Sequence, residues 1–460
     1  MKTKVLIVIL GTILFFTACG SSEEKETIND SNISINQDTY KAEEKLFADE
    51  NINKTEMKLN EHIAIWTADL TEMRDSLPKL AIGFTRFLSL EEWENSIDTL
   101  IMDMNSSYMS DEEIVYRTKE IIAKVRNAHT WFVNNAYEYN MFYYPISFMK
   151  MADGDYYITG VPENYKEVFG AKIEAINGNS MDEVIDEYKR IYPCETEIAI
   201  EGSIGTDMMS YNDLSYLGLA NEKKCQFSLI LRNGERKDIM IEPLLEDEIK
   251  NCTAYTLKDH IDVLPLRLQQ SEGTNDNYWY KIDEVNRVFY FKYNRGVDEE
   301  KYIDFSDKMV ETMVANQDKY DKFVVDLRTN PGGNARFLMN FLFKYNNFLK
   351  VQDTRILVGN ITFSGGIAAV DDFLYYVNKV TIYGSETGGI VGGFTDSGTL
   401  KLDKSGNAIN YSTLLTGYSR LAERKKQTDI WRGIIPDVEV VPTIDEYLSG
   451  YDTVYEKAVE

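Results

Sequence analysis

Histidine and cysteine are scarce in this 460-residue chain, which contains three histidines and four cysteines. No Cys-x-x-Cys pair and no cluster of cysteine with histidine occurs, so the sequence indicates no metal site and no cofactor. Of the three cysteines that follow the N-terminal region, two could pair outside the cytoplasm, but all three cannot pair internally. Buried free thiols are the simpler expectation for Cys194, Cys225 and Cys252.

Positive charge is also in short supply, with 49 lysines and arginines against 75 aspartates and glutamates. The formal net charge of −26 argues against nucleic acid as a partner, because binding to phosphates depends on a basic surface. Hydrophobic residues make up 43% of the chain and aromatic residues 12%, which is enough to build packed cores. A chain of this length exceeds what one core usually supports, so we expect two or three domains.

The N-terminus has an apolar run, but one too short to span a bilayer comfortably. Lys2 and Lys4 precede the apolar stretch from Val5 to Phe16, a pattern typical of a secretory signal. The stretch ends in FTACG, which resembles a bacterial lipobox, although phenylalanine stands where an aliphatic residue is usual. In a lipobox the cysteine is lipidated and becomes the mature N-terminus, so Cys19 is the predicted lipidation site. A plain signal peptide with a chance cysteine is the alternative.

These features predict where the protein resides. Residues 1–18 would be a lipoprotein signal peptide, and residues 19–50, rich in Ser, Glu, Asn and Asp, a flexible tether. We therefore expect a protein that is anchored by lipid to the cell membrane and faces outside the cytoplasm.

The rest of the chain divides by its hydrophobic pattern, and it shows no internal repeat. Apolar residues recur at helical spacing over residues 51–140, which predicts an N-terminal helical domain with helix starts at Ser89 and Ser110. Short alternating strands follow over residues 141–250, with an Asn-Gly hairpin signal at 233–234. This region resembles a PDZ domain, in which a strand edge binds an extended peptide. Over residues 275–445 strands alternate with helices, which indicates an α/β core.

A serine in the α/β region is a candidate nucleophile. Ser364 ends an apolar run and precedes two glycines in TFSGG, a pattern that also fits an ordinary turn. No histidine follows Ser364, and the first glycine of GxSxG is missing, so the chain order of α/β-hydrolases is excluded. The base must come from upstream or be another residue type, as in Ser-Lys enzymes.

The three histidines differ in their surroundings. His62 and His260 lie in polar helical contexts, where a surface or packing role is expected. His129 stands in RNAHT, where a helix stops and an extended segment begins. A histidine at a helix end is more often a C-cap than a catalytic base, so the position of His129 does not by itself indicate a catalytic role.

A glycine-rich turn follows a buried strand in VVDLRTNPGGN. The turn at Pro331-Gly332-Gly333 can aim backbone N–H groups at one point, which suits an oxyanion; the alternative is an ordinary strand-to-helix turn. Asp326 and Arg328 are expected to form a structural ion pair.

Five motifs occur in the order RNAHT, DLRTNPGG, TFSGG, GSETGG and GIIPDVEV. This order resembles the S41 peptidases, which comprise the C-terminal processing (tail-specific) proteases and the tricorn-like proteases. The resemblance extends over residues 60–450. It implies a ClpP/crotonase-like α/β protease core with an N-terminal helical domain and an inserted PDZ-like domain, within an α/β multidomain fold class.

The resemblance also implies roles for individual residues. Ser364 would be the nucleophile, with oxyanion donors at the backbone of Gly365 and of Gly332 or Gly333. In the Ser-Lys branch a lysine stands where this chain has Glu386, so that base is missing.

The tricorn-like branch instead uses a histidine in a DGHT-like motif, which RNAHT matches at His129. The acid that orients the histidine would fall near Ile430, which is not acidic. Asp429 is the nearest acid, with Glu423 and Glu386 as alternatives, and Ala128 stands where a serine relay would be.

The sequence thus predicts a membrane-anchored serine endopeptidase that hydrolyses peptides or proteins through Ser364, with His129 as general base. A surface lipoprotein that binds peptides without cleaving them is the alternative, and a structural envelope protein is a third reading. The sequence assigns neither a cleavage specificity nor an oligomeric state.

Overall fold

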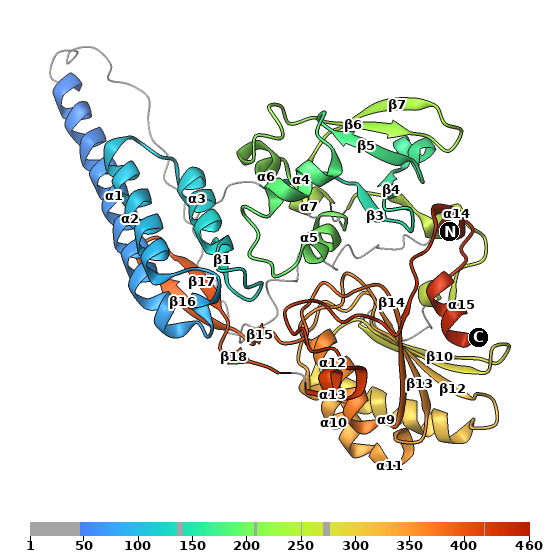
Figure 1. The fold of residues 1–460 in the computed structure, drawn as a ribbon. Helices are drawn as coiled ribbons and strands as arrows, with labels where there is room; N and C mark the ends of the chain where they lie inside the picture. The colour runs from blue at the N-terminus through green and yellow to red at the C-terminus, as the bar shows by residue number, and fades with distance from the viewer. Residues whose placement is uncertain (1–46, 136–140, 207–208, 250, 270–276, 418) are drawn as a thin grey trace, which may run out of the picture.

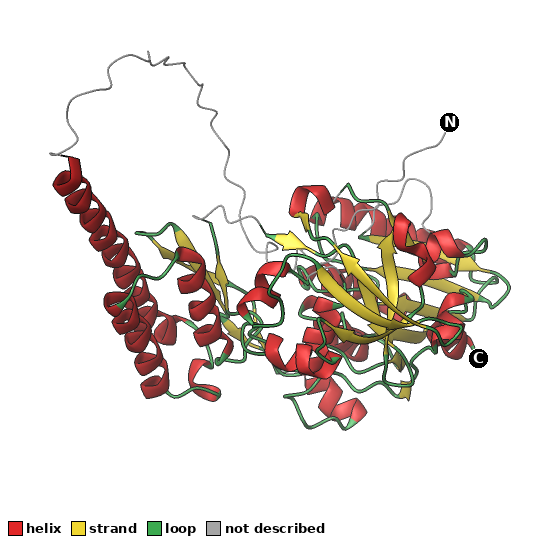
Figure 2. Cartoon of the chain, turned by 90° about the horizontal axis from the view of Figure 1, so that it is seen from above, coloured by secondary structure: helices red, strands yellow, loops and turns green. Residues whose placement is uncertain are grey.

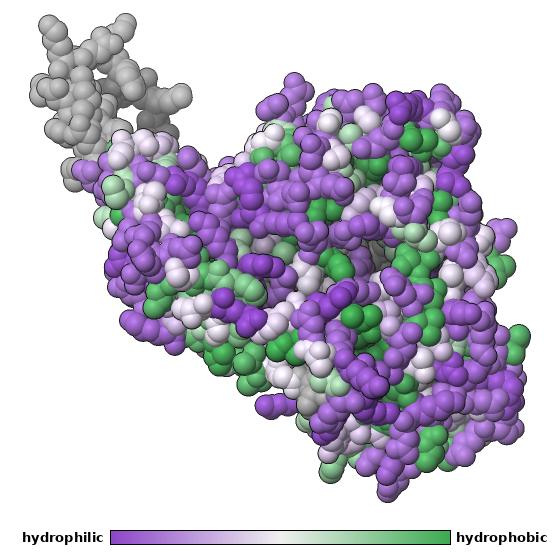
Figure 3. Space-filling view, in the orientation of Figure 1, coloured by the Kyte–Doolittle hydropathy of each residue, from purple (hydrophilic) through white to green (hydrophobic). Residues whose placement is uncertain are grey.

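The computed structural model describes residues 47–460 except 136–140, 207–208, 250, 270–276 and 418. The predicted signal peptide, the lipidation site Cys19 and nearly all of the predicted tether lie outside the described residues. Within the described part, no helix combines the length and the apolar character that crossing a membrane requires. Hydrophilic side chains dominate the face shown in Figure 3, as the strongly acidic composition leads one to expect.

Three helices form a layer at one end of the molecule (Figure 1): α1 (Phe47–Leu80), α2 (Leu90–Ser106) and α3 (Asp111–Ala123). The predicted helix starts are confirmed. The Ser89 hydroxyl accepts the Glu92 N–H, and the Ser110 hydroxyl accepts the Glu113 N–H. Each bond satisfies a backbone donor that the first helical turn leaves free.

The helical layer is completed by a hairpin from far along the chain, which the sequence analysis did not anticipate. Strands β16 (Gly398–Leu402) and β17 (Asn407–Tyr411) pair with β1 (Trp131–Val133) in a three-stranded antiparallel sheet. Leu402 and Ile409 pack in the same core as the tryptophans of α1 and α2. Figures 1 and 2 show this sheet beside the helices, away from the main α/β sheet. The boundary predicted at residue 140 therefore leaves out one part of the helical layer.

A middle module is built on a six-stranded sheet with the order β3-β4-β5-β6-β7, in which β9 also pairs with β4. The strands are β3 (Ser147–Lys150), β4 (Tyr156–Pro162), β5 (Lys172–Ile176), β6 (Cys225–Ile230), β7 (Arg236–Ile241) and β9 (Ala254–Thr256). The predicted Asn-Gly hairpin is confirmed between β6 and β7, where Gly234 has φ +84°.

The long stretch between residues 188 and 219 contains two helices, α5 (Glu197–Ile204) and α6 (Tyr211–Tyr216), and α4 (Met181–Tyr188) precedes them. The chain beyond α5 lies along the outer edge of the module's sheet. Phe148 N–H donates to Gly205 O at 2.9 Å, and Tyr144 N–H donates to Met209 O at 3.0 Å. Part of the strand edge on which a PDZ domain would hold a peptide is thus used by the chain itself.

The α/β core contains a six-stranded sheet with the order β10-β11-β12-β13-β14-β19. Only the pairing of β10 (Tyr278–Asp283) with β11 (Val288–Tyr293) is antiparallel. The parallel strands are β11, β12 (Lys322–Asp326), β13 (Asp353–Val358), β14 (Lys379–Gly384) and β19 (Val438–Glu439). Helices α9 (Glu299–Ala315), α10 (Arg336–Lys344) and α12 (Gly365–Tyr376) pack on one face.

The remaining elements are short: β2 (Phe142–Tyr143), β8 (Leu244–Leu245), β15 (Phe394–Thr395), β18 (Leu414–Leu415), α7 (Glu246–Ile249), α8 (Leu257–His260), α11 (Asn346–Leu349), α13 (Ser419–Lys425), α14 (Ile444–Leu448) and α15 (Thr453–Val459). Helix α15 packs on the other face of the core sheet. The strands β15 and β18 pair with each other and connect the core to the β16–β17 hairpin (Figure 1).

Buried charges at the end of β12 link the core sheet to the C-terminal segment. Asp326 is fully buried, and Arg328 Nη2 lies 2.6 Å from its carboxylate, which confirms the predicted structural ion pair. Arg328 also bonds Asp452 at 2.6 Å. Of the three cysteines expected to be buried free thiols, Cys225 is buried and free, whereas Cys194 and Cys252 are only half-buried.

Ile409→Ala tests whether the hairpin belongs to the helical layer. Ile409 is fully buried opposite Phe132, so we expect a loss of about 3 kcal/mol in the free energy of unfolding. Thermal unfolding followed by circular dichroism measures the change. Ile303→Ala is the control, because that side chain is 48% exposed on α9. Equal shifts for the two variants would contradict the packing described.

Candidate active site

Ser364 lies in the loop that follows β13, immediately before α12. Its backbone has φ +47° and ψ −113°, a conformation that non-glycine residues rarely adopt. Such strain concentrates at functional sites because the surrounding structure must enforce it. Here Thr362 helps to enforce it: its hydroxyl donates to Leu327 O at 2.8 Å and accepts Gly359 N–H at 3.0 Å.

His129 approaches this serine from the helical layer, between α3 and β1. Its Nε2 lies 3.0 Å from Ser364 Oγ, within hydrogen-bonding reach. The imidazole stacks on the Phe363 ring, with 5.0 Å between centroids and an interplanar angle of 18°. The fold therefore brings together two residues that the sequence places 235 positions apart.

The backbone around His129 is fixed by Asn127. The Asn127 side chain accepts the His129 N–H at 2.9 Å and donates to Ser412 Oγ at 2.8 Å. Ser412 follows β17, so the returning arm of the hairpin supports the histidine segment. His62 and His260 take no part: His62 bonds Asp111 at 2.6 Å, and His260 packs against Phe169.

The His129 ring is poised as a neutral base. Only 9% of the residue is exposed, and burial lowers the pKa of His129 to about 4, while the Asp396 carboxylate acts in the opposite direction. At neutral pH the imidazole is therefore uncharged and can accept a proton at Nε2. Its Nδ1 is buried and has no hydrogen-bond partner among the described residues.

Asp396 is the acid whose charge acts on His129, and it is not among the acids predicted from the motifs. It lies two residues before β16, and His129 lies two residues before β1; these two strands flank β17. Both residues are thus at the same end of one small sheet. Asp396 Oδ1 accepts the Ser397 N–H at 2.9 Å, and the residue is exposed. No local motif marks Asp396, because only the pairing of distant strands places it near the histidine.

The acids proposed from the motifs are engaged elsewhere. Glu386 forms an ion pair with Arg432 and accepts the Gly433 N–H at 3.1 Å. Asp429 accepts the Trp431 N–H at 3.0 Å, and Glu423 pairs with Arg420 at 2.5 Å. Within the described residues, no hydrogen bond or ion pair joins His129 to any of these carboxylates. The third catalytic acid stays a prediction.

The glycine turn after β12 lies directly against Ser364. A Cβ on Gly332 would lie 2.9 Å from the Ser364 Cβ, and one on Gly365 would lie 2.6 Å from Gly333 O. Real Cβ atoms do not come this close, so only glycine fits. Gly332 and Gly333 also have φ +120° and +104°, which side chains disfavour.

Asn330 decides which of the two glycines has a free N–H. Its Oδ1 accepts the Gly332 N–H at 2.7 Å, and its own carbonyl accepts Phe363 N–H at 3.0 Å. Among the bonds of the described residues, the N–H groups of Gly333 and Gly365 have no acceptor. Gly365 also begins α12, whose N-terminal dipole favours negative charge. Of the alternatives at 332 and 333, the geometry thus favours Gly333 as the partner of Gly365.

The comparisons with known proteins identify the fold. No family model matches the chain, and no curated protein matches it. Among solved structures, mature CPAF complexed with lactacystin is similar over 86% of this chain and 98% of its own, with a TM-score of 0.62 and 11% identity. Another structure of mature CPAF gives a TM-score of 0.61 at 12% identity, over 86% and 96% of the two chains. The photosystem II D1 C-terminal processing protease matches with a TM-score of 0.40 and 11% identity, over 85% and 98%.

The likeness to CPAF extends over nearly the whole of that chain. The predicted fold class, an α/β multidomain protein, is confirmed by it.

The middle module contacts the site through Glu195. Its Oε1 accepts the Ala128 N–H at 3.1 Å, next to His129, and its Oε2 is buried without a partner among the described residues. Burial raises the pKa of Glu195 to about 7. The next residue, Thr196, donates to Gly388 O at 3.0 Å in the core. One short segment thus joins all three parts of the protein at the site.

A small apolar cavity of about 50 Å³ lies beside His129 and Ser364. Ala128 and Phe363, their neighbours in sequence, line it on one side, and Pro193, Cys194 and Ile200 line it from the middle module. An apolar side chain of a ligand bound next to Ser364 could pack against this lining.

The low pKa of His129 can be measured directly, because the chain contains only three histidines. With 13C-labelled histidine, NMR should show one ring that titrates near pH 4, and this signal should be absent from His129→Gln. Because the folded pKa is depressed below the unfolded value of 6.5, the neutral ring is favoured by folding. Its contribution to stability is complete above pH 6.5 and is lost as the pH falls towards 4. A His129 ring that titrates at 6.5 would contradict this account.

Gly332→Ala should disable Ser364 with little damage to the rest of the fold. The added methyl group meets Ser364 Cβ and the Gly365 N–H, so it displaces the nucleophile and one oxyanion donor, and we expect labelling of Ser364 by a fluorophosphonate to slow at least ~100-fold. Gly154→Ala is the matched control. It has φ +85° and nothing within 4 Å, so it carries a similar backbone penalty without the clash. Labelling at the native rate in Gly332→Ala would refute the argument.

Proposed function

We propose that the protein is a serine endopeptidase that hydrolyses peptide bonds in peptides or proteins. The observation that carries this proposal is the 3.0 Å contact between His129 Nε2 and Ser364 Oγ, beside two backbone N–H groups without acceptors. A nucleophile, a neutral base and an oxyanion site are the elements that acyl transfer requires.

The reaction would proceed through an acyl-enzyme. Ser364 Oγ attacks the peptide carbonyl carbon while its proton passes to His129 Nε2. The carbonyl electrons move onto oxygen, and the N–H groups of Gly333 and Gly365 stabilise the resulting charge. When the C–N bond breaks, His129 returns the proton to the leaving amine. Water then attacks the ester by the same route and releases the acid.

The middle module would act as a PDZ-like domain that presents or gates an extended peptide. Its connection to the site through Glu195 and Thr196 supports this role, since a change in the module reaches the histidine segment directly.

The proposed cellular location is supported by the N-terminal motif alone. Lipid on Cys19 would hold the protein on the outer side of the cell membrane.

A peptide-binding lipoprotein that does not cleave is the second candidate. The buried Nδ1 of His129 favours it, because no described carboxylate holds the ring in the tautomer that catalysis needs.

Two substitutions separate these functions. Ser364→Ala and His129→Ala should each lower peptide hydrolysis at least ~1,000-fold, since removal of either group eliminates the same step. Both variants should unfold within a few degrees of the wild type. Hydrolysis is measured on a quenched-fluorescence peptide library, and a fluorophosphonate should label the native protein at Ser364 alone. Undiminished turnover in His129→Ala would exclude it as the base, and a native protein that resists the phosphonate would favour the non-cleaving alternative.

A further inference from the structure

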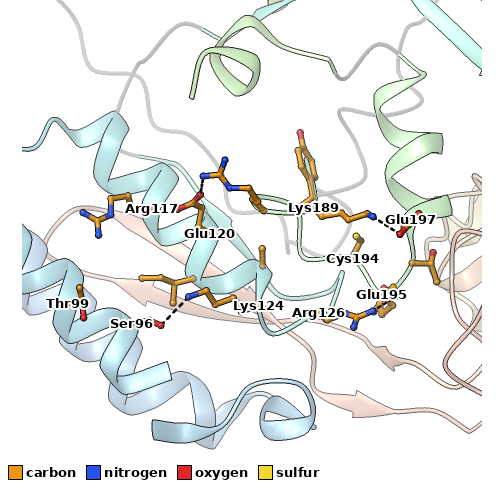
Figure 4. Close-up of a pocket in the computed structure, with 15 residues that line it drawn as sticks. Ser96, Thr99, Arg117, Glu120, Lys124, Arg126, Lys189, Cys194, Glu195 and Glu197 are labelled. Atoms are coloured by element: carbon orange, nitrogen blue, oxygen red, sulfur yellow. Dashed lines mark hydrogen bonds and ion pairs between the residues drawn. The ribbon is translucent and has the colours of Figure 1, made fainter. Parts of the chain in front are cut away.

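A larger cleft of about 800 Å³ lies next to the catalytic site (Figure 4). Helix α3 and the segment after it form one wall, with Lys124 and Arg126, and the chain between α4 and α5 forms the other. The cleft shares Tyr192 and Cys194 with the apolar cavity beside Phe363. A chain bound across Ser364 could thus continue from the cavity into the cleft.

The lining is rich in positive charge, although the whole protein has a net charge of −26. Five cationic side chains reach the cleft, and three of them are neutralised by neighbouring acids. The ion pairs are Arg117 with Asp103 at 2.7 Å, Lys189 with Glu197 at 2.5 Å, and Arg190 with Glu120 at 2.6 Å.

Lys124 and Arg126 differ from these three, because neither forms an ion pair with any described residue. Lys124 Nζ donates to Ser96 Oγ at 3.3 Å, and Arg126 Nη2 donates to the backbone carbonyl of Glu195 at 3.3 Å, as Figure 4 shows. The Arg126 guanidinium also lies 4.8 Å from the centre of the Phe87 ring. Both residues are exposed, so both charges are available to a ligand in the cleft.

Two carboxyl groups lie within electrostatic range of these cations: that of Glu92 for Lys124, and that of Glu195 for Arg126. Burial outweighs the influence of Arg126 and leaves the pKa of Glu195 at about 7, so near neutral pH the group carries only part of a negative charge. Arg126 itself has φ +52°, an unfavourable conformation for an arginine. Strained backbone is concentrated at functional sites, so a strained residue that presents a cation without an ion-pair partner to a cleft indicates a ligand-binding site.

We propose that the cleft binds an acidic side chain of the substrate, an aspartate or a glutamate, through Lys124 and Arg126. The proposal rests on the proposed function and adds a substrate class to it. Arg126 lies three residues before His129, a distance of at most about 10 Å along the backbone. An extended substrate covers a similar distance in about three residues, so we expect the acidic residue within about three positions of the bond that is cleaved.

Binding to Ser364→Ala tests this proposal without cleavage. The probes are acetylated, amidated peptides with one leucine in an alanine-serine background. Each carries a single glutamate at one of the three positions on either side of the leucine, and each has a matched peptide with glutamine instead. At low salt we expect the best glutamate peptide to bind about 10-fold more tightly than its match, measured by isothermal titration calorimetry. At about 1 M NaCl the preference should nearly vanish, because the Debye length falls to about 3 Å.

Variants in the same background assign the preference to residues. Lys124→Gln and Arg126→Gln should each reduce the ratio at least about threefold, while Arg126→Lys should retain most of it. Lys258→Gln is the matched control: it removes the same charge at an exposed site on α8, without an ion pair among the described residues. Lys124→Glu should shift the preference towards peptides that carry lysine.

The outcomes separate this inference from the proposed function. Equal binding of every glutamate and glutamine pair would overturn the acidic-residue site, even if fluorophosphonate labelling supports the peptidase. A preference that survives both glutamine variants would overturn the assignment to Lys124 and Arg126. If peptides with a free C-terminal carboxylate bind tightly without any glutamate, and the two variants abolish that binding, the ligand is the chain terminus and the side-chain proposal falls.

Discussion

The pairing of β1 with β17 is the contact on which the candidate site depends. Strand β1 continues directly from His129, whereas β17 is part of an excursion from the core that carries Ser364. The three register pairs, from Trp131 with Asn410 to Val133 with Ala408, hold the two parts of the chain together. Asn127 adds a hydrogen bond to Ser412, just beyond the end of β17. Together these contacts fix the segment that holds His129 Nε2 at 3.0 Å from Ser364 Oγ.

Hydrogen bonds between loops, rather than regular secondary structure, hold the backbone around Ser364 in place. Asn330 is fully buried and bonds the turn at Gly332, the backbone of Phe363 and the end of β11 at Tyr293. Because these groups are shielded from water, loss of the amide would leave several of them unsatisfied. The positive φ of Ser364 is therefore held by the loops after three adjacent strands rather than by local preference.

Local patterns were enough to predict much of this arrangement. The helix starts at Ser89 and Ser110, the Asn-Gly hairpin and the alternation of strands with helices each depend on residues that are close in sequence. The approach of His129 to Ser364 was reached through motif order and the lack of any later histidine. Local patterns could not predict that β16 and β17 join the helical layer. That arrangement depends on pairing between residues almost 280 positions apart, such as Trp131 and Asn410. Asp396 was missed for the same reason, and Glu195 because nothing local marks a carboxyl that becomes buried.

The separation of His129 and Ser364 in sequence also determines when the candidate site can assemble. A chain emerging from a ribosome or a translocation channel has its histidine segment long before its serine, and the bracing hairpin follows the serine. Until the last of these segments has docked, Ser364 has no histidine beside it. The order of synthesis thus delays assembly of the candidate site until the chain is nearly complete.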